Sequence, residues 1–172
     1  MAVSAGGTGT KAEPALLGIY LNDHLAGATG GVELVRRSAG AHRGAPAGVT
    51  LSRLATEIEQ DRESLLQMMA ALEVPVRQYK VYSAWVAEKV GRLKLNGHLL
   101  DRSPLSSLIE LETLRLGVEG KASLWRTLRQ VAEHEPRLDV ARLETLLQRA
   151  TRQVDTLEEL RMQASAEAFS TA

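Results

Sequence analysis

The stretch SLIELETLRLGVEGKASLWRTLRQVA, residues 107–132, decides the fold class because its apolar residues recur at helical spacing over many turns. A helix advances about 100° per residue, so these positions gather into one wide stripe. The stripe consists of Leu108, Leu111, Leu114, Val118, Ala122 and Trp125, and Leu105, Ile109 and Leu116 extend it on one side. Such a pattern predicts a long helix that packs on more than one side.

Four charged residues interrupt the apolar arc of this helix, namely Glu112, Arg115, Glu119 and Arg126. Charged side chains are rarely buried unless they pair with one another or bind something. These positions are therefore the first candidates for a functional site.

The rest of the chain follows the same helical pattern, interrupted by stretches rich in glycine and proline. We expect long helices over about 14–39, 49–73, 104–133 and 139–168, and a shorter basic amphipathic helix within 76–95. Residues 1–13 are small and glycine-rich, which is typical of a flexible tail. The predicted domains are an N-terminal tail (1–13), one helical domain (14–168) and a C-terminal tail (169–172).

These helices predict an all-α fold, an antiparallel four-helix bundle with the short extra helix in the crossover between helices 2 and 3. Helices of this length bury their apolar stripes best side by side. In the first helix, Gly27, Gly30 and Gly31 fall within the helical pattern, where glycine is unfavourable. We expect close approach of a neighbouring helix to compensate for them, and a break of the helix there is the alternative.

Composition narrows the classes of function. The chain has 21 basic and 21 acidic residues, so no net charge attracts it to nucleic acid or to a membrane surface. It has no cysteine, which fits a reducing cytoplasm, and the first residues do not resemble a signal peptide. No run approaches the roughly 18 apolar residues of a membrane span. We therefore predict a cytoplasmic protein without membrane contact.

Further polar residues lie on the apolar faces of the other helices, and they define the candidate site. His24 lies at the edge of the first stripe, and Asp61 and Arg62 interrupt the second. A bundle could bring these residues together with Glu112, Arg115 and Glu119. One interpretation is a buried ion network, because Arg115 is three residues from Glu112 and four from Glu119. A small anionic or polar ligand held by Arg62 and Arg115 is another.

Three stretches carry a resemblance to known proteins: YLNDHLAGATGGVELVRR (20–37), AWVAEKVGRLKLNGHLLDRSPL (84–105) and ELETLRLGVEGKASLWRTL (110–128). They resemble a group of uncharacterised bacterial helical bundles of the ferritin-like superfamily. The resemblance implies a ferritin-like outline but brings no assigned activity.

The ferritin-like resemblance also raises the question of a metal site. Ferritin-like metal sites need Glu from two helices and Glu-x-x-His from the other two. This chain offers only His24, Asp61, Glu112 and Glu119 as ligands, so its ligand set is not intact and we predict no cofactor.

The basic segment that follows the second helix carries Tyr79, Tyr82 and Trp85 beside several Arg and Lys residues. Such a mixture can bind nucleic acid through phosphate contacts and stacking. The zero net charge favours the alternative, in which these aromatic residues pack on the bundle or on a second subunit.

Together these patterns predict a non-catalytic helical bundle, a structural or interaction protein that self-associates as a dimer around a buried ion network. The alternatives are a ferritin-like metalloprotein or oxidase that binds iron or manganese, and a module that binds nucleic acid or a small anionic ligand.

Overall fold

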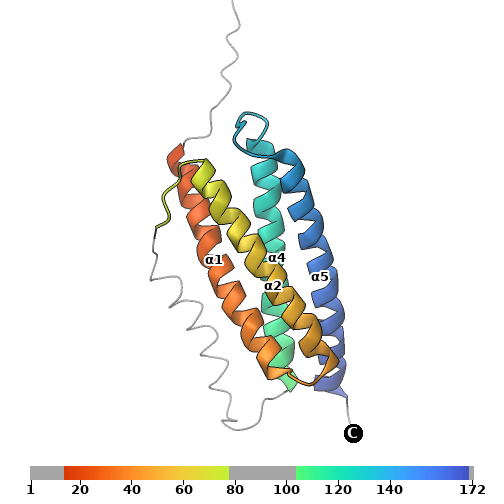
Figure 1. Ribbon diagram of the computed structural model, residues 1–172. Coiled ribbons are helices and arrows are strands. Elements are labelled where there is room, and N and C mark those ends of the chain that lie inside the picture. Colours follow the sequence, from red (N-terminus) through yellow and green to blue (C-terminus); the bar gives the residue numbers. More distant parts are fainter. Residues whose placement is uncertain (1–13, 78–103, 171–172) are drawn as a thin grey trace, which may run out of the picture.

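The computed structural model describes residues 14–77 and 104–170 and shows four long helices (Figure 1). They are α1 (Pro14–Ala41), α2 (Pro46–Ala71), α4 (Pro104–Val131) and α5 (Val140–Phe169). The described residues contain no strand, so the all-α prediction is confirmed for this part of the chain. The helix bounds lie within a few residues of those predicted. The tail 1–13 and most of the predicted short helix lie outside the described residues.

Helix α1 continues without interruption through Gly27, Gly30 and Gly31, so the alternative of a break is wrong. Leu21, Leu25, Val32 and Val35 are buried and form its core face. No helix among the described residues approaches Gly27 or Gly31 in the expected way, because a Cβ atom at either position would meet none of these residues within 4 Å.

Helix α2 begins with Pro46, whose missing N–H suits the first helical position. Its predicted apolar stripe, Leu51, Leu54, Ile58, Leu65, Met69 and Leu72, is entirely buried. The chain leaves the helix at Glu73, which has a positive φ of 58°. Residues 74–77 then pass across α1, where the Asn22 side chain donates to Pro75 O (3.1 Å) and accepts from Arg77 N (2.7 Å).

Helix α4 buries all six residues of its predicted stripe, but the extension of that stripe is wrong. Leu116 is 68% exposed and Leu105 is 43% exposed. The helix packs mainly against α5 and α1, so part of its circumference remains at the surface. Leu116 and the charged residues beside it lie on that part.

Helix α5 is started by Asp139, whose side chain accepts a hydrogen bond from Arg142 N. This is the usual way in which an acidic N-cap satisfies a free N–H at a helix start. Its core face contains Leu143, Leu146, Ala150 and Leu157, and also the buried polar residue Gln153.

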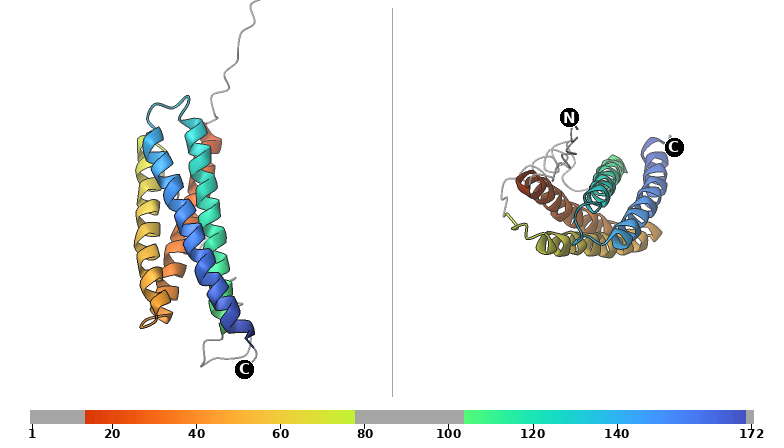
Figure 2. Two further views of the ribbon diagram at one scale, coloured as in Figure 1. Left: turned by 90° about the vertical axis from the view of Figure 1, so that its right-hand side faces the viewer. Right: turned by 90° about the horizontal axis from the view of Figure 1, so that it is seen from above.

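The helices associate in two pairs, α1 with α2 and α4 with α5, each joined by a short connection (Figures 1 and 2). Helix α1 also packs along α4, whereas α2 approaches α5 at only a few positions. The arrangement is that of a helical bundle. The described helices include none that is long and apolar enough to cross a bilayer.

Candidate functional site

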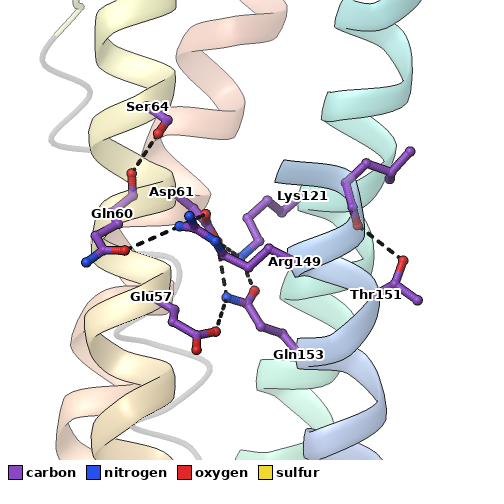
Figure 3. Close-up of polar contacts among 9 residues, drawn as sticks. Glu57, Gln60, Asp61, Ser64, Lys121, Arg149, Thr151 and Gln153 are labelled. Carbon is purple, nitrogen blue, oxygen red and sulfur yellow. Dashed lines mark hydrogen bonds and ion pairs between the residues drawn. The ribbon is translucent and has the colours of Figure 1, made fainter. Parts of the chain in front are cut away.

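Asp61 of α2 is fully buried and is the centre of a polar cluster between the two helix pairs (Figure 3). Its Oδ2 lies 2.5 Å from Lys121 Nζ of α4, and its Oδ1 lies 3.0 Å from Arg149 Nη1 of α5. A buried carboxylate is costly unless it is paired and hydrogen-bonded. Here two cations from two other helices neutralise it.

Gln153 of α5 joins the cluster through both the oxygen and the nitrogen of its side-chain amide. Its Oε1 accepts from Lys121 Nζ at 2.5 Å, and its Nε2 donates to Glu57 Oε2 at 3.0 Å and to Asp61 Oδ2 at 3.3 Å. The amide therefore uses both its acceptor and its donor group. Two acids and two bases take part in the cluster, so the formal charges balance. We call Glu57, Asp61, Lys121, Arg149 and Gln153 the Asp61 network.

The buried position of Lys121 in this network shifts its pKa. Burial lowers the pKa of its ammonium group below the usual value, because the charged form loses its hydration. The neighbouring Asp61 acts in the opposite direction, through its charge and its hydrogen bond, but does not fully offset burial.

A cavity of about 530 Å³ lies beside the network, between α1, α2 and α4. Asp61 and Lys121 form part of its wall, and α1 and α4 contribute Gly27, Gly31 and Gly117. The glycines that the sequence pattern places in the helices therefore line open space.

Three of the predicted site residues meet at this cavity, namely His24, Asp61 and Arg62. The His24 ring lies edge-on to Tyr20, with 4.5 Å between the ring centroids. Burial lowers the pKa of His24, and the charge of Asp23 partly offsets this effect. Arg62 Nε donates to Thr29 Oγ1 on α1 at 3.0 Å.

The other three predicted site residues, all on α4, do not reach the network or the cavity. Arg115 Nε lies 3.0 Å from Glu158 Oε2 on α5, and Glu112, 47% exposed, lies 3.8 Å from Arg161 Nη1. Glu119 forms no ion pair with any described residue. The expected pairs within the helix are thus replaced by pairs between α4 and α5 at the surface.

The geometry also tests the two ligands that the sequence suggests, a metal ion and a small anion. The candidate metal ligands His24, Asp61, Glu112 and Glu119 do not converge, and no group of three His, Asp or Glu residues within 14–77 and 104–170 could hold a metal. Arg62 and Arg115 contact different partners, so they do not form a common anion site.

The aromatic interface candidates Tyr79, Tyr82 and Trp85 lie outside the described residues. Of the basic segment, only its first residues are described.

Lys121, Arg149, Gln153 and Glu57 are site residues that the sequence pattern did not predict. A signal existed for two of them, because Lys121 lies among Leu114, Val118 and Trp125 at helical spacing, and Gln153 lies between Ala150 and Leu157. Arg149 and Glu57 lie at the edges of the apolar stripes of their helices, and helical spacing alone does not show that they reach the network.

Comparison with protein families, with curated proteins and with solved structures finds no match to the chain.

Proposed function

We propose that the chain is a non-catalytic structural or interaction protein, in which the Asp61 network fixes how the two helix pairs are put together. The observation that carries the proposal is the complete burial of Asp61 between cations from α4 and α5. Both carboxylate oxygens are engaged, and a catalytic acid or base would need one that can reach a substrate. Buried ion pairs add little net stability, and their best attested use is to specify which partners pair and in which register.

The proposal includes the antiparallel, ferritin-like arrangement and the cytoplasmic location that the sequence predicts. The short connections after α1 and after α4 support an antiparallel order within each pair. The cysteine-free sequence supports the location.

Replacement of Asp61 by Leu tests the structural role of the network. The change leaves Lys121 and Arg149 with an uncompensated buried charge, and we expect it to lower the free energy of unfolding by roughly 3–5 kcal/mol. The triple variant Asp61→Leu/Lys121→Met/Arg149→Met removes the charges together and should recover most of this loss. Urea unfolding followed by circular dichroism measures both effects.

A matched control is Arg36→Met, which breaks the exposed ion pair between Arg36 and Glu59. Exposed pairs contribute about 0–1 kcal/mol, so this variant should unfold almost like the wild type. An Asp61→Leu protein as stable as the wild type would contradict the proposal. Loss of dispersed amide signals in the NMR spectrum of a stable triple variant would show directly that the network specifies the packing.

Self-association is the second part of the proposal, and a row of apolar side chains on α4 supports it. Leu116 is 68% exposed, and the half-buried Ile109 lies two helical turns before it on the same face. Exposed apolar patches of this kind often mark contacts with a partner. We expect a reversible dimer in sedimentation equilibrium.

The α4 surface can be tested by Leu116→Gln, which should shift that equilibrium towards the monomer. Met162→Gln on α5 is the control, because Met162 is similarly exposed but lies on another helix. A protein that stays monomeric at every concentration would refute self-association.

A further inference from the structure

The cavity between α1, α2 and α4 reaches the surface where α1 and α4 face each other. Asp23 and Gly27 of α1 and Thr113 and Gly117 of α4 line it, and all four are exposed. The rest of its wall is mainly apolar. A space of about 530 Å³ is much larger than the voids that close-packed protein interiors retain. Apolar side chains from elsewhere would fit such a space.

Helices α1 and α4 contact each other on both sides of this opening. Tyr20 Oη donates a hydrogen bond to Thr127 Oγ1 at 3.2 Å, and Ser38 Oγ donates one to Glu110 Oε2 at 2.8 Å. The first residues of α4 therefore lie beside the last residues of α1, and the last residues of α4 lie beside the first of α1. These two contacts mark the ends of the cavity.

Two glycines face each other between these contacts. Gly31 on α1 and Gly117 on α4 are each seven residues from the Ser38–Glu110 contact along their own helix. They therefore lie at the same level of the bundle. A Cβ atom at either glycine would meet no described residue within 4 Å.

The chain between α2 and α4 runs from one end of the cavity to the other. On one side, the Asn22 side chain on α1 holds Pro75 O and Arg77 N near the start of α1. On the other side, α4 begins at Pro104, beside the end of α1. The end of α2 and the start of α4 thus lie at opposite ends of the bundle (Figure 1). Residues 78–103 are attached at both ends to the helices that border the cavity.

The short helix that the sequence predicts in this segment has the length that this path requires. From Asn22 to Ser38 the axis of α1 advances by about 24 Å, at about 1.5 Å per residue. A helix over residues 78–94 advances by about the same distance. Residues 95–103, which include Asn96 and Gly97, remain for the turn into α4.

The segment also carries an apolar stripe that needs a surface to pack on. At helical spacing the stripe consists of Tyr79, Tyr82, Val86, Val90 and Leu93. A helix of this kind is stable when its stripe is buried against a partner. The apolar wall of the cavity lies beside the path of the segment and offers such a partner.

The charges favour the same pairing. Residues 78–103 include five basic and two acidic residues, whereas the rest of the chain has 16 basic and 19 acidic residues. Opposite net charges attract the segment to the bundle. Asp23 in the cavity wall is exposed and forms no ion pair with any described residue. It is therefore available to a basic side chain of the segment.

We infer that residues 78–94 dock as a helix in the opening between α1 and α4, with the apolar stripe turned into the cavity. A helix that starts with Arg77 level with Asn22 places Val86 level with Gly31, nine residues further along each chain segment. Val86 then lies between Gly31 and Gly117. The occupant of the cavity is a segment of the same chain, and the inference goes beyond the role proposed for the Asp61 network.

Engineered cysteines test this contact directly, because the chain has none of its own. The full-length double variant Val86→Cys/Gly117→Cys should form a disulfide within one chain under mild oxidation, since this bond requires Cα atoms within about 7 Å. Electrophoresis without reductant shows it as a faster band, and mass spectrometry identifies the linked peptides. Val86→Cys/Gly31→Cys probes the same level from α1 and should also form the bond.

Two control pairs keep one cysteine in place and turn the other away. Glu88→Cys/Gly117→Cys moves the first cysteine to the far side of the predicted helix, because two residues correspond to about 200°. Val86→Cys/Glu119→Cys moves the second cysteine to another face of α4 in the same way. Neither pair should form the bond in a protein whose circular dichroism matches that of the wild type.

Limited digestion with trypsin tests the docking without any cysteine. The lysine and arginine residues of the segment are cleaved only when it opens locally. Val86→Asp puts a carboxylate against the apolar wall and should accelerate cleavage within 78–103 by roughly tenfold or more. Ala84→Asp is the matched control, because Ala84 lies outside the stripe, and it should be cleaved like the wild type.

Several results would overturn the inference. The first is the absence of a disulfide from both test pairs in folded protein, and the second is equal cleavage of the wild type and Val86→Asp. Either would leave the cavity to a different molecule. Disulfides formed only between chains would assign the cavity to a second copy. None of these variants changes the Asp61 network, so failure here would leave the proposed role of that network intact.

Discussion

The charged residues of this protein differ greatly in exposure and in their partners, according to where their helix places them. Asp61 is fully buried and meets two cations, whereas Arg115 and Glu158 are 34% and 39% exposed and meet at the surface. The sequence shows both as charges within apolar patterns. The rotation of each helix against its neighbours decides which charge faces inward, and this rotation depends on the packing of all four helices.

Replacement of Arg115 by Leu should therefore have a small effect. The side chains of Arg115 and Glu158 are 34% and 39% exposed, and pairs near the surface contribute about 0–1 kcal/mol. We expect the free energy of unfolding in urea to fall by less than about 1 kcal/mol. A loss as large as that of Asp61→Leu would show that Arg115 is buried and paired instead.

His24 should make the stability depend on pH. Its pKa in the folded protein is lowered from the usual 6.5 by burial, so near pH 7 both the folded and the unfolded states are neutral at this residue. Below 6.5 the unfolded state takes up a proton more readily than the folded state, and the free energy of unfolding falls as the pH falls towards the lowered pKa. Urea unfolding between about pH 7.5 and 5.5 measures this slope.

The variant His24→Gln provides the comparison for this slope, because it cannot titrate in the same range. Its unfolding free energy should change less over the same interval. Parallel slopes for the wild type and for His24→Gln would contradict the assignment of the pH dependence to this residue.

At the scale of single helices, the sequence predicts most of what the structure contains. The stripes of α2 and α4 are buried residue by residue, because the apolar spacing of a long helix leaves few alternatives. The prediction fails for Leu116, since apolar residues outside the stripe can lie at the surface. At Gly27 and Gly31 no helix among the described residues approaches as expected, because a sequence gives no measure of how closely the next helix lies.

Those glycines give a direct prediction for helix α1. Gly27→Ala should raise the free energy of unfolding by about 0.5–1 kcal/mol, since alanine favours the helix and its Cβ would meet no described residue within 4 Å. Gly48→Ala in α2 should destabilise the protein instead, because a Cβ there would lie 2.2 Å from His42 O. Thermal unfolding of the two variants compares these effects, and a destabilised Gly27→Ala protein would refute the open space beside α1.

At the scale of the molecule, the four helices divide into two pairs, which pack more closely within each pair than between them. One hydrophobic core includes residues of all four helices, and the region between the pairs also contains the Asp61 network and the cavity. The sequence predicts the bundle and a polar centre, but not this division. The division depends on which helices are closest, and that is a property of the whole assembly.

Native-state hydrogen exchange should reveal this division. Because the helices pack less closely between the pairs than within them, we expect the amides of α1 and α2 to open as one cooperative unit and those of α4 and α5 as another. Exchange measured at increasing urea concentration distinguishes the two units. Convergence of all four helices on a single opening reaction, with no earlier step, would show that the bundle is one cooperative unit.

The division into two helix pairs also has a consequence for assembly. Asp61 would meet Lys121 and Arg149 equally well if the α4–α5 pair came from another copy of the chain, because all contacts between the pairs would be the same. Exchange of identical elements between protomers is a low-cost route to a dimer. The Asp61 network, which we propose to fix the packing within one chain, would then serve, without any new surface, as the recognition element of a domain-swapped dimer.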